Sequence, residues 1–131
     1  MEKLTKFFIV FILMLFVSSV AIAQDTVMSE KDYDQYLIKA LKDKNDGIRA
    51  SAAQLLGDRE VQEAVEPLIK MLKKEQNKSA RIVAALALYK IGDEKALPVL
   101  KKFAKYEKSK TAKHVMTAIV YEMQTVLLAK E

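Results

Sequence analysis

Few residues of this chain have the chemistry of a catalytic or metal-binding site. His114 is the single histidine and cysteine is absent, so the usual His and Cys ligands of a zinc site are not available. The chain has three glycines and no glycine-rich loop of the kind that holds phosphate groups. Ala50, Ile82 and His114 are equally spaced along the chain. Because the first two are apolar, we expect His114 to be a half-buried packing residue and not a general base. We therefore predict a protein that is not an enzyme and that binds no cofactor or metal ion.

Acidic and basic residues form the most regular chemical pattern in the sequence. An acidic residue lies six positions before a basic one three times, and the three pairs are evenly spaced along the chain. At this spacing the acid would lie where one helix ends and the base in the first turn of the next. Partly buried pairs of this kind fix the register of stacked units more than they add stability. The pattern predicts a structural ladder, and no catalytic pair, made of Asp43 and Arg49, Glu75 and Arg81, and Glu107 and Lys113.

Small and apolar residues recur at the same spacing as the bases of these pairs. The interval from Arg49 to Arg81 equals the interval from Arg81 to Lys113, and we call it the repeat period. After each of these three bases, such residues follow at three, four and seven positions, and further apolar pairs recur upstream. Three repeated units are therefore present. After the three bases, the matching sets are Ala52, Ala53 and Leu56; Ala84, Ala85 and Leu88; and Met116, Thr117 and Val120. Upstream of the bases, the matching pairs are Tyr33 and Tyr36, Val65 and Leu68, and Leu97 and Leu100.

Helix signals convert this repeat into a fold. Pro67 and Pro98 suit the starts of helices, and Gly57 and Gly92 suit helix C-termini, where a left-handed residue is wanted. Residues 82–88 are apolar all round, as expected for a central helix between neighbours. We predict an all-α fold, a right-handed α-α superhelix of about three helix pairs. Its helices are expected over residues 30–43, 47–57, 62–74, 79–91, 94–106 and 110–129.

These residues resemble a known repeat family. The stretch from Leu41 to Arg49, the Leu55-Leu56-Gly57-Asp58 sequence and the later Ala96-Leu97-Pro98 are similar to HEAT repeats, in particular to the short HEAT-like repeats also seen in phycobilin lyases. The resemblance covers about residues 29–123 and implies a helical solenoid. It implies no lyase chemistry, because no matching active-site constellation is present. Glu in place of Asp at two turns, and Lys113 in place of Arg, imply a ladder that weakens toward the C-terminus.

The first residues have the layout of a secretory signal peptide. Lys3 and Lys6 precede an unbroken apolar run from Phe7 to Val17, and Ala21-Ile22-Ala23 forms a small-residue cleavage pattern. We predict a signal peptide over 1–23, a linker over 24–29 and a HEAT-like domain over 30–131, with units of about 30–58, 59–92 and 93–131. The expected location is the bacterial envelope, periplasmic or secreted after cleavage near Ala23.

The predicted function is a protein-interaction scaffold. Tyr89 and Tyr121 lie one repeat period apart on the second helices of their units, and Tyr is a favoured contact residue at interfaces. In the alternative interpretation, both tyrosine rings pack into the core between repeats. The predicted partner surface comprises Val83, Tyr89, Lys90, Val115, Tyr121 and Glu122.

A basic C-terminal half provides an alternative function. Residues 67–131 contain 14 basic and 6 acidic residues, whereas residues 24–66 contain 6 and 10. Lys101, Lys105 and Lys108 align on one helical face and are the candidate basic patch. In the expected compartment its target would be anionic lipid or a cell-wall polymer, and not nucleic acid. In the simpler interpretation, these lysines form a solvated face without a partner. A homodimer that pairs at an end of the stack is a further alternative.

Overall fold

The computed structural model describes residues 1–12 and 27–130. The predicted cleavage site near Ala23 lies outside these residues. The chain divides into two compact units, Met1–Asp32 and Tyr33–Glu131. In the first unit, residues 2–12 are helical and their large apolar side chains are exposed. Among the described residues, no helix has both the length and the apolar character needed to cross a membrane.

The second unit is built from helices joined by short turns, which confirms the predicted all-α class. The 3-10 turn η1 opens the segment that was predicted to be helical from residue 62, and the first predicted helix ends early, at Ala40. The elements are α2 (Glu30–Ala40), α3 (Asp46–Asp58), η1 (Gln62–Ala64), α4 (Val65–Lys74), α5 (Lys78–Ile91), α6 (Ala96–Tyr106) and α7 (Lys110–Leu128).

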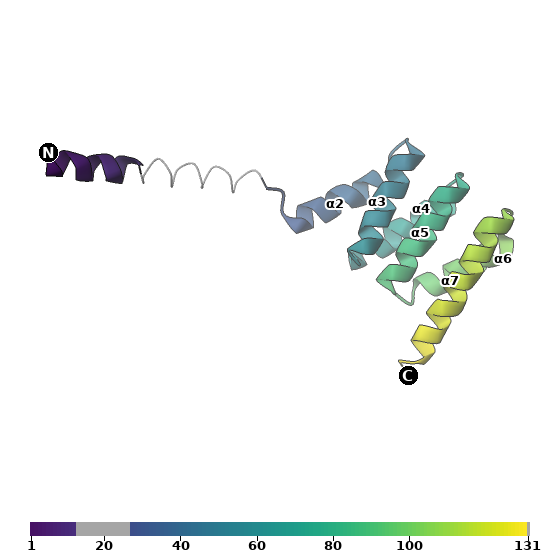
Figure 1. Ribbon diagram of the computed structural model, residues 1–131. Helices are drawn as coiled ribbons and strands as arrows, with labels where there is room; N and C mark the ends of the chain where they lie inside the picture. Colours follow the sequence, from purple (N-terminus) through teal and green to yellow (C-terminus); the bar gives the residue numbers. More distant parts are fainter. Residues whose placement is uncertain (13–26, 131) are drawn as a thin grey trace. The chain divides into compact units, whose positions relative to one another are not determined.

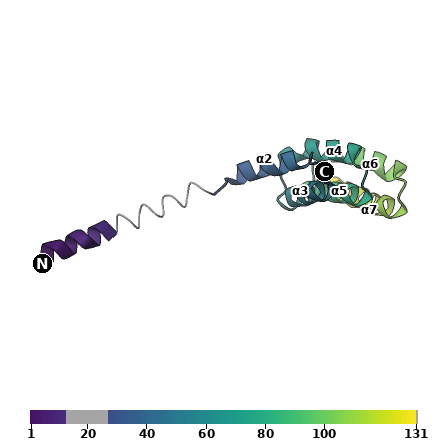
Figure 2. The ribbon, with the colours of Figure 1, turned by 90° about the horizontal axis from the view of Figure 1, so that it is seen from above.

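The helices form two layers that are visible edge-on in Figure 2. The first layer contains α2, α4 and α6, and the second layer contains α3, α5 and α7. In the second layer α5 lies between α3 and α7 (Figure 1). Consecutive helices therefore alternate between layers, which is the arrangement of a short α-solenoid.

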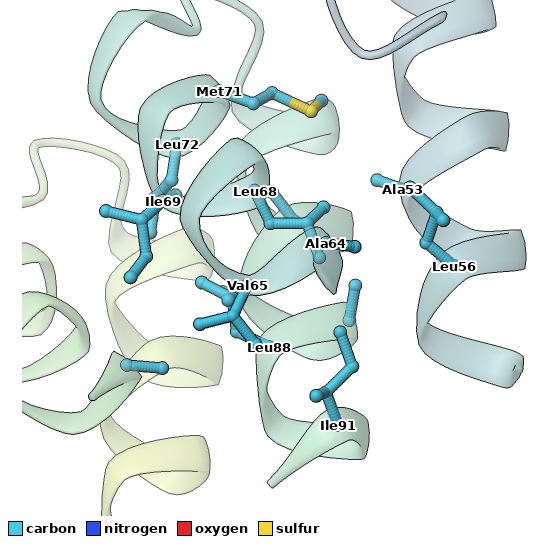
Figure 3. Close-up of a cluster of buried hydrophobic side chains, with 14 of the residues drawn as sticks. Ala53, Leu56, Ala64, Val65, Leu68, Ile69, Met71, Leu72, Leu88 and Ile91 are labelled. Carbon is cyan, nitrogen blue, oxygen red and sulfur yellow. The ribbon is translucent and has the colours of Figure 1, made fainter. Parts of the chain in front are cut away.

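A continuous hydrophobic core lies between the two layers. Its largest fully buried side chains come from α3, α4, α5, α6 and α7, and Figure 3 shows those of α3, α4 and α5 meeting. Complete burial of one such leucine contributes about 1.5–3 kcal/mol relative to exposure. These side chains are Leu56, Leu68, Leu72, Leu88, Leu100 and Met116.

The turn that enters each second-layer helix has the same capping chemistry. The side chain of Asn45 accepts hydrogen bonds from Gly47 and Ile48, and that of Asn77 accepts them from Ser79 and Ala80. The hydroxyl oxygen of Ser109 accepts one from Ala112 at 3.4 Å. These caps satisfy backbone N–H groups that a helix start leaves without partners. Because they recur at the repeat period, every second-layer helix begins in the same way.

The two glycines predicted at helix C-termini have different roles. Gly92 is left-handed, with φ of 73°, and ends α5 as predicted. Gly57 is the second-last residue of α3 and is not left-handed, so the left-handed role predicted for it was wrong. A Cβ at Gly57 would lie 2.7 Å from the Cα of Ala87, which shows that the glycine lets α3 and α5 approach closely. The left-handed residue after α3 is Glu60, with φ of 51°.

The register of α2 also differs from the predicted one. Leu37 and Leu41 enter the core, and they precede Leu68 and Leu72 by one position less than the repeat period. Tyr36, expected in the phase of Leu68, is exposed. The ends of the helices differ as well, because Leu41 lies in the turn after α2, which spans residues 41–45, whereas Leu72 lies within α4.

Candidate partner-binding face

The predicted ladder is formed between neighbouring units. Arg49 donates from Nε to Oε2 of Glu75 at 2.7 Å and from Nη2 to Oε1 at 2.8 Å. Its Nη1 donates to the backbone oxygens of Asp43 and Lys44, at 2.8 and 3.0 Å. The arginine thus contacts the backbone of the acid that precedes it in its own unit, and its ion pair is with the acid of the next unit.

The second rung repeats this geometry one unit later. Arg81 donates to both carboxylate oxygens of Glu107 at 2.8 Å, and its Nη1 donates to the oxygen of Gln76 at 2.8 Å. Asp43 and Lys113 take no part in a rung among the described residues. The Asp43 carboxylate accepts from the N–H of Asn45 at 2.8 Å, and Lys113 Nζ donates to the backbone oxygen of Lys105 at 3.3 Å.

Both rung glutamates are buried and charged. The side chains of Glu75 and Glu107 are 1% and 3% exposed. Hydrogen bonds from Arg49 hold the pKa of Glu75 below its ordinary value against the opposing effect of burial, and Arg81 does the same for Glu107. The Glu75 carboxylate correspondingly raises the pKa of Arg49. A carboxylate held ionised by two bonds from one arginine is a poor proton donor or acceptor near neutral pH, so this geometry supports a structural role.

The residues of the predicted partner surface occupy several environments. Val83, Tyr89 and Val115 are partly buried against the core. Tyr89 lines a groove of about 580 Å³ together with Lys90, Met123 and Val126. Tyr121 is 69% exposed and is not part of the groove lining.

The remaining residues of that surface are Lys90, near the end of α5, and Glu122, in the second half of α7. Lys90 contacts the carboxylate of Asp58 on α3, and Glu122 is exposed on α7. The structure thus places Tyr89 in a groove between charged neighbours, and Tyr121 on open surface.

An exposed apolar residue in the centre of the second layer was missed from the sequence. The segment 82–88 was predicted to be buried on all sides, but Leu86 is 38% exposed. Neighbouring helices flank α5 on two sides and the first layer covers a third, so its fourth side stays open. The same side of α3 and α7 presents Gln54 and Ala118, which are also exposed. The even spacing of Gln54, Leu86 and Ala118 at the repeat period was the signal that could have identified this row.

Contacts between the helices show that α3 and α5 lie in register. At one end Asn77 Nδ2 donates to Asp46 Oδ2 at 2.6 Å, and at the other Lys90 contacts Asp58. Leu86 lies one helical turn before Lys90, and Gln54 one turn before Asp58. We call the row of Gln54, Leu86 and Ala118 the central row. It is a small, mostly apolar strip bordered by charged residues.

Other predicted residues are exposed to solvent. Lys101, Lys105 and Lys108 are exposed on or just after α6, and Lys105 Nζ lies 5.3 Å from the centre of the Tyr106 ring. His114 is exposed and not half-buried as predicted, because α7 has a second-layer neighbour on one side, whereas α5, which carries the half-buried Ile82 in the same phase, has one on each side. In the described part of the chain, no group of three or more His, Asp or Glu residues is arranged to hold a metal ion.

Comparison with known proteins agrees with this architecture. The HEAT repeats family matches residues 35–119, and the chain belongs to that family. HEAT repeat domains are generally protein-interaction scaffolds and are typically not catalytic. A comparison with curated proteins found no match.

Proposed function

We propose that this protein is a non-enzymatic scaffold that binds a partner protein through the second-layer face, with Leu86 as the central contact. The observation that carries the proposal is the exposure of Leu86 in the middle of a helix whose other apolar residues are buried or half-buried. Membership of the HEAT repeats family supports the same function.

The face has the chemistry of a protein interface. Interface centres are depleted of charge and are surrounded by a polar rim. Here the central row contains no charged residue, and Asp58, Lys90 and Glu122 border it at one end. The second-layer helices pack closely, as at Gly57 and Ala87, so little order must be gained on binding. Rigid surfaces of this kind bind at a smaller entropic cost.

We also propose that the scaffold works in the bacterial envelope. The basic start, apolar run and Ala-x-Ala pattern of residues 1–23 support export. Identification of the N-terminal residue of the protein recovered from envelope fractions tests this proposal. A chain that starts at Gln24 is expected, whereas a full-length chain retained in the cytoplasm would contradict export.

Affinity capture from envelope extract at high salt tests the scaffold function. Bait proteins would be the wild type, Leu86→Lys and the matched control Leu128→Lys, which changes an equally apolar residue that is exposed at the end of α7. We expect one distinct protein to be retained by the wild type and the control and to be lost with Leu86→Lys, because a buried lysine at the interface centre would lack a partner.

The remaining outcomes have defined meanings. Retention of the partner by all three baits would reject the central row as the binding surface, and the double change Tyr89→Ala/Tyr121→Ala would then test the groove and α7. Capture of nothing at high salt would reject a protein scaffold. Recovery of the protein itself would identify a homo-oligomer. Circular dichroism of each variant confirms that the helices are retained.

A further inference from the structure

One edge of the solenoid concentrates lysines that are separated widely in the sequence. The turns that lead into α3, α5 and α7 lie side by side, along the upper edge in Figure 1. Exposed lysines flank the second and third of these turns. We call them the basic edge, which consists of Lys73, Lys74, Lys78, Lys105, Lys108 and Lys110.

The ladder leaves this edge with an excess of positive charge. Glu75 and Glu107 are the acids of these two turns, and Arg49 and Arg81 already occupy both carboxylates. Between residues 33 and 130, no lysine of the basic edge forms an ion pair with a carboxylate. The opposite edge, where second-layer helices end, carries both signs of charge, with Asp58, Glu60, Glu63 and Glu94 beside Arg59, Lys90, Lys95 and Lys130. The excess of positive charge therefore belongs to the basic edge and not to the opposite one.

Helix stability accounts for only part of this arrangement. Lys73 and Lys74 end α4, where the helix dipole favours a cation. Lys78 and Lys110 are the first residues of α5 and α7, and the first turns of both helices lack an acidic residue. A cation at a helix start is unfavourable by about 0.3–1 kcal/mol. An external anion would remove this cost.

Apolar grooves open beside the same lysines. A groove of about 660 Å³ between α2 and α4 is lined by Leu41, Pro67 and Met71 together with Lys70 and Lys74. An equivalent groove of about 370 Å³ between α4 and α6 is lined by Leu72, Phe103 and Tyr106 together with Lys73 and Lys108. Each groove reaches a rung of the ladder, at Glu75 or Glu107. The edge thus combines repeated cations with apolar recesses and an exposed tyrosine, Tyr106.

We propose that the basic edge docks the protein edge-on onto an anionic phospholipid surface. Lysine clusters attract such surfaces by a non-directional electrostatic effect. A soluble polyanion would account for the lysines but not for the apolar grooves, and Tyr106 is of the type that lies at membrane interfaces. Lysine is a flexible point charge, unlike the arginines, whose forked geometry is used inside the ladder. This proposal concerns a surface other than the central row and does not depend on the scaffold function.

Flotation of the full chain with lipid vesicles tests the proposal. The readout is the ratio of binding to phosphatidylglycerol/phosphatidylcholine vesicles over binding to vesicles of phosphatidylcholine alone, so that apolar binding by residues 7–17 affects both terms. The edge variant is Lys74→Gln/Lys78→Gln/Lys110→Gln. Its matched control is Lys90→Gln/Lys95→Gln/Lys130→Gln, which removes the same charge from exposed lysines at the opposite edge.

We expect the edge variant to lower this ratio about a hundredfold, because each lysine near an anionic surface contributes about fivefold. The control should change the ratio far less, and high salt should abolish the difference between the two variants. Equal losses in both variants would overturn the proposal, since net charge alone would then be responsible. An unchanged ratio in the edge variant would overturn it as well. Binding of the wild type to soluble polyphosphate without binding to anionic vesicles would identify a polymer as the ligand instead.

Discussion

At the scale of single residues, the rung pairs show how an acid and a base can recur at a fixed spacing without pairing with each other inside one unit. Glu75 accepts two bonds from Arg49 and one from the N–H of Asn77, at 2.9 Å for the last. Its backbone oxygen in turn accepts from Arg81 at 3.3 Å. One glutamate therefore joins the arginines of two successive units. This double use explains why the acid and the base recur together in successive units.

Replacing the rung carboxylate should destabilise the fold. In Glu75→Gln, Arg49 keeps its backbone contacts but loses a charged partner that is buried, and hydrogen bonds to charged groups contribute about 1.5–3 kcal/mol. We expect the free energy of unfolding to fall by about 2 kcal/mol in urea denaturation. The exposed Glu94→Gln is the matched control and should change it by less than about 0.5 kcal/mol. Equal stability of the two variants would show that the rung contributes nothing.

The same pairs predict how stability depends on pH. The folded pKa of Glu75 and of Glu107 lies below the ordinary value of 4.5, so the unfolded state binds protons first as the pH falls. The stability that the rungs contribute is complete above about pH 4.5 and is lost as the pH falls through the folded pKa. Urea midpoints measured at decreasing pH should decline more steeply for the wild type than for Glu75→Gln/Glu107→Gln. Parallel curves would contradict the assignment.

At the scale of elements, the distance between α3 and α5 is set by small residues. Gly57 has no Cβ where one would lie 2.9 Å from the Cβ of Ala87, so the two helices approach more closely than larger side chains would allow. The same two helices are also joined by the contact of Lys90 with Asp58 and by the hydrogen bond from Asn77 to Asp46. The central row depends on the register of these two helices.

Gly57→Ala is therefore expected to destabilise the protein, although alanine is the better helix former. Helix propensity alone would stabilise the variant by about 1 kcal/mol. Overpacking against Ala87 costs about 1–3 kcal/mol and should dominate. Thermal unfolding followed by circular dichroism gives the sign directly. A rise in melting temperature would mean that α3 and α5 can separate without cost.

At the scale of the whole molecule, each helix is stabilised by the neighbours that cover it. Six residues of α5 are buried, including Ala84, Ala85 and Leu88, whereas α2 contributes only Leu37. In a solenoid, stability is close to a sum of units and their interfaces. The helix with neighbours on both sides should consequently open last.

Hydrogen exchange read out by mass spectrometry should show this gradient. We expect backbone amides of α5 to exchange most slowly and those of α2 to exchange fastest within residues 33–130, because local opening follows the amount of buried apolar contact. Exchange of all helices at one common rate would instead indicate a single cooperative unit.

The sequence by itself determined the helices, their pairing and the membership of the repeat family, because capping residues and the repeat period are local properties of the chain. It also pointed to Arg49, Glu75, Arg81 and Glu107 at the turns, although Asp43 and Lys113, predicted with them, form no rung in the described part of the chain. The tertiary structure decided the rest. Three features depend on which neighbour lies beside each helix. They are the acid that Arg49 pairs with, the need for a glycine at position 57, and the exposure of Leu86 and His114. Burial and pairing across units are properties of the packed layers, and a periodic apolar pattern does not reveal which side of a helix the packing leaves open.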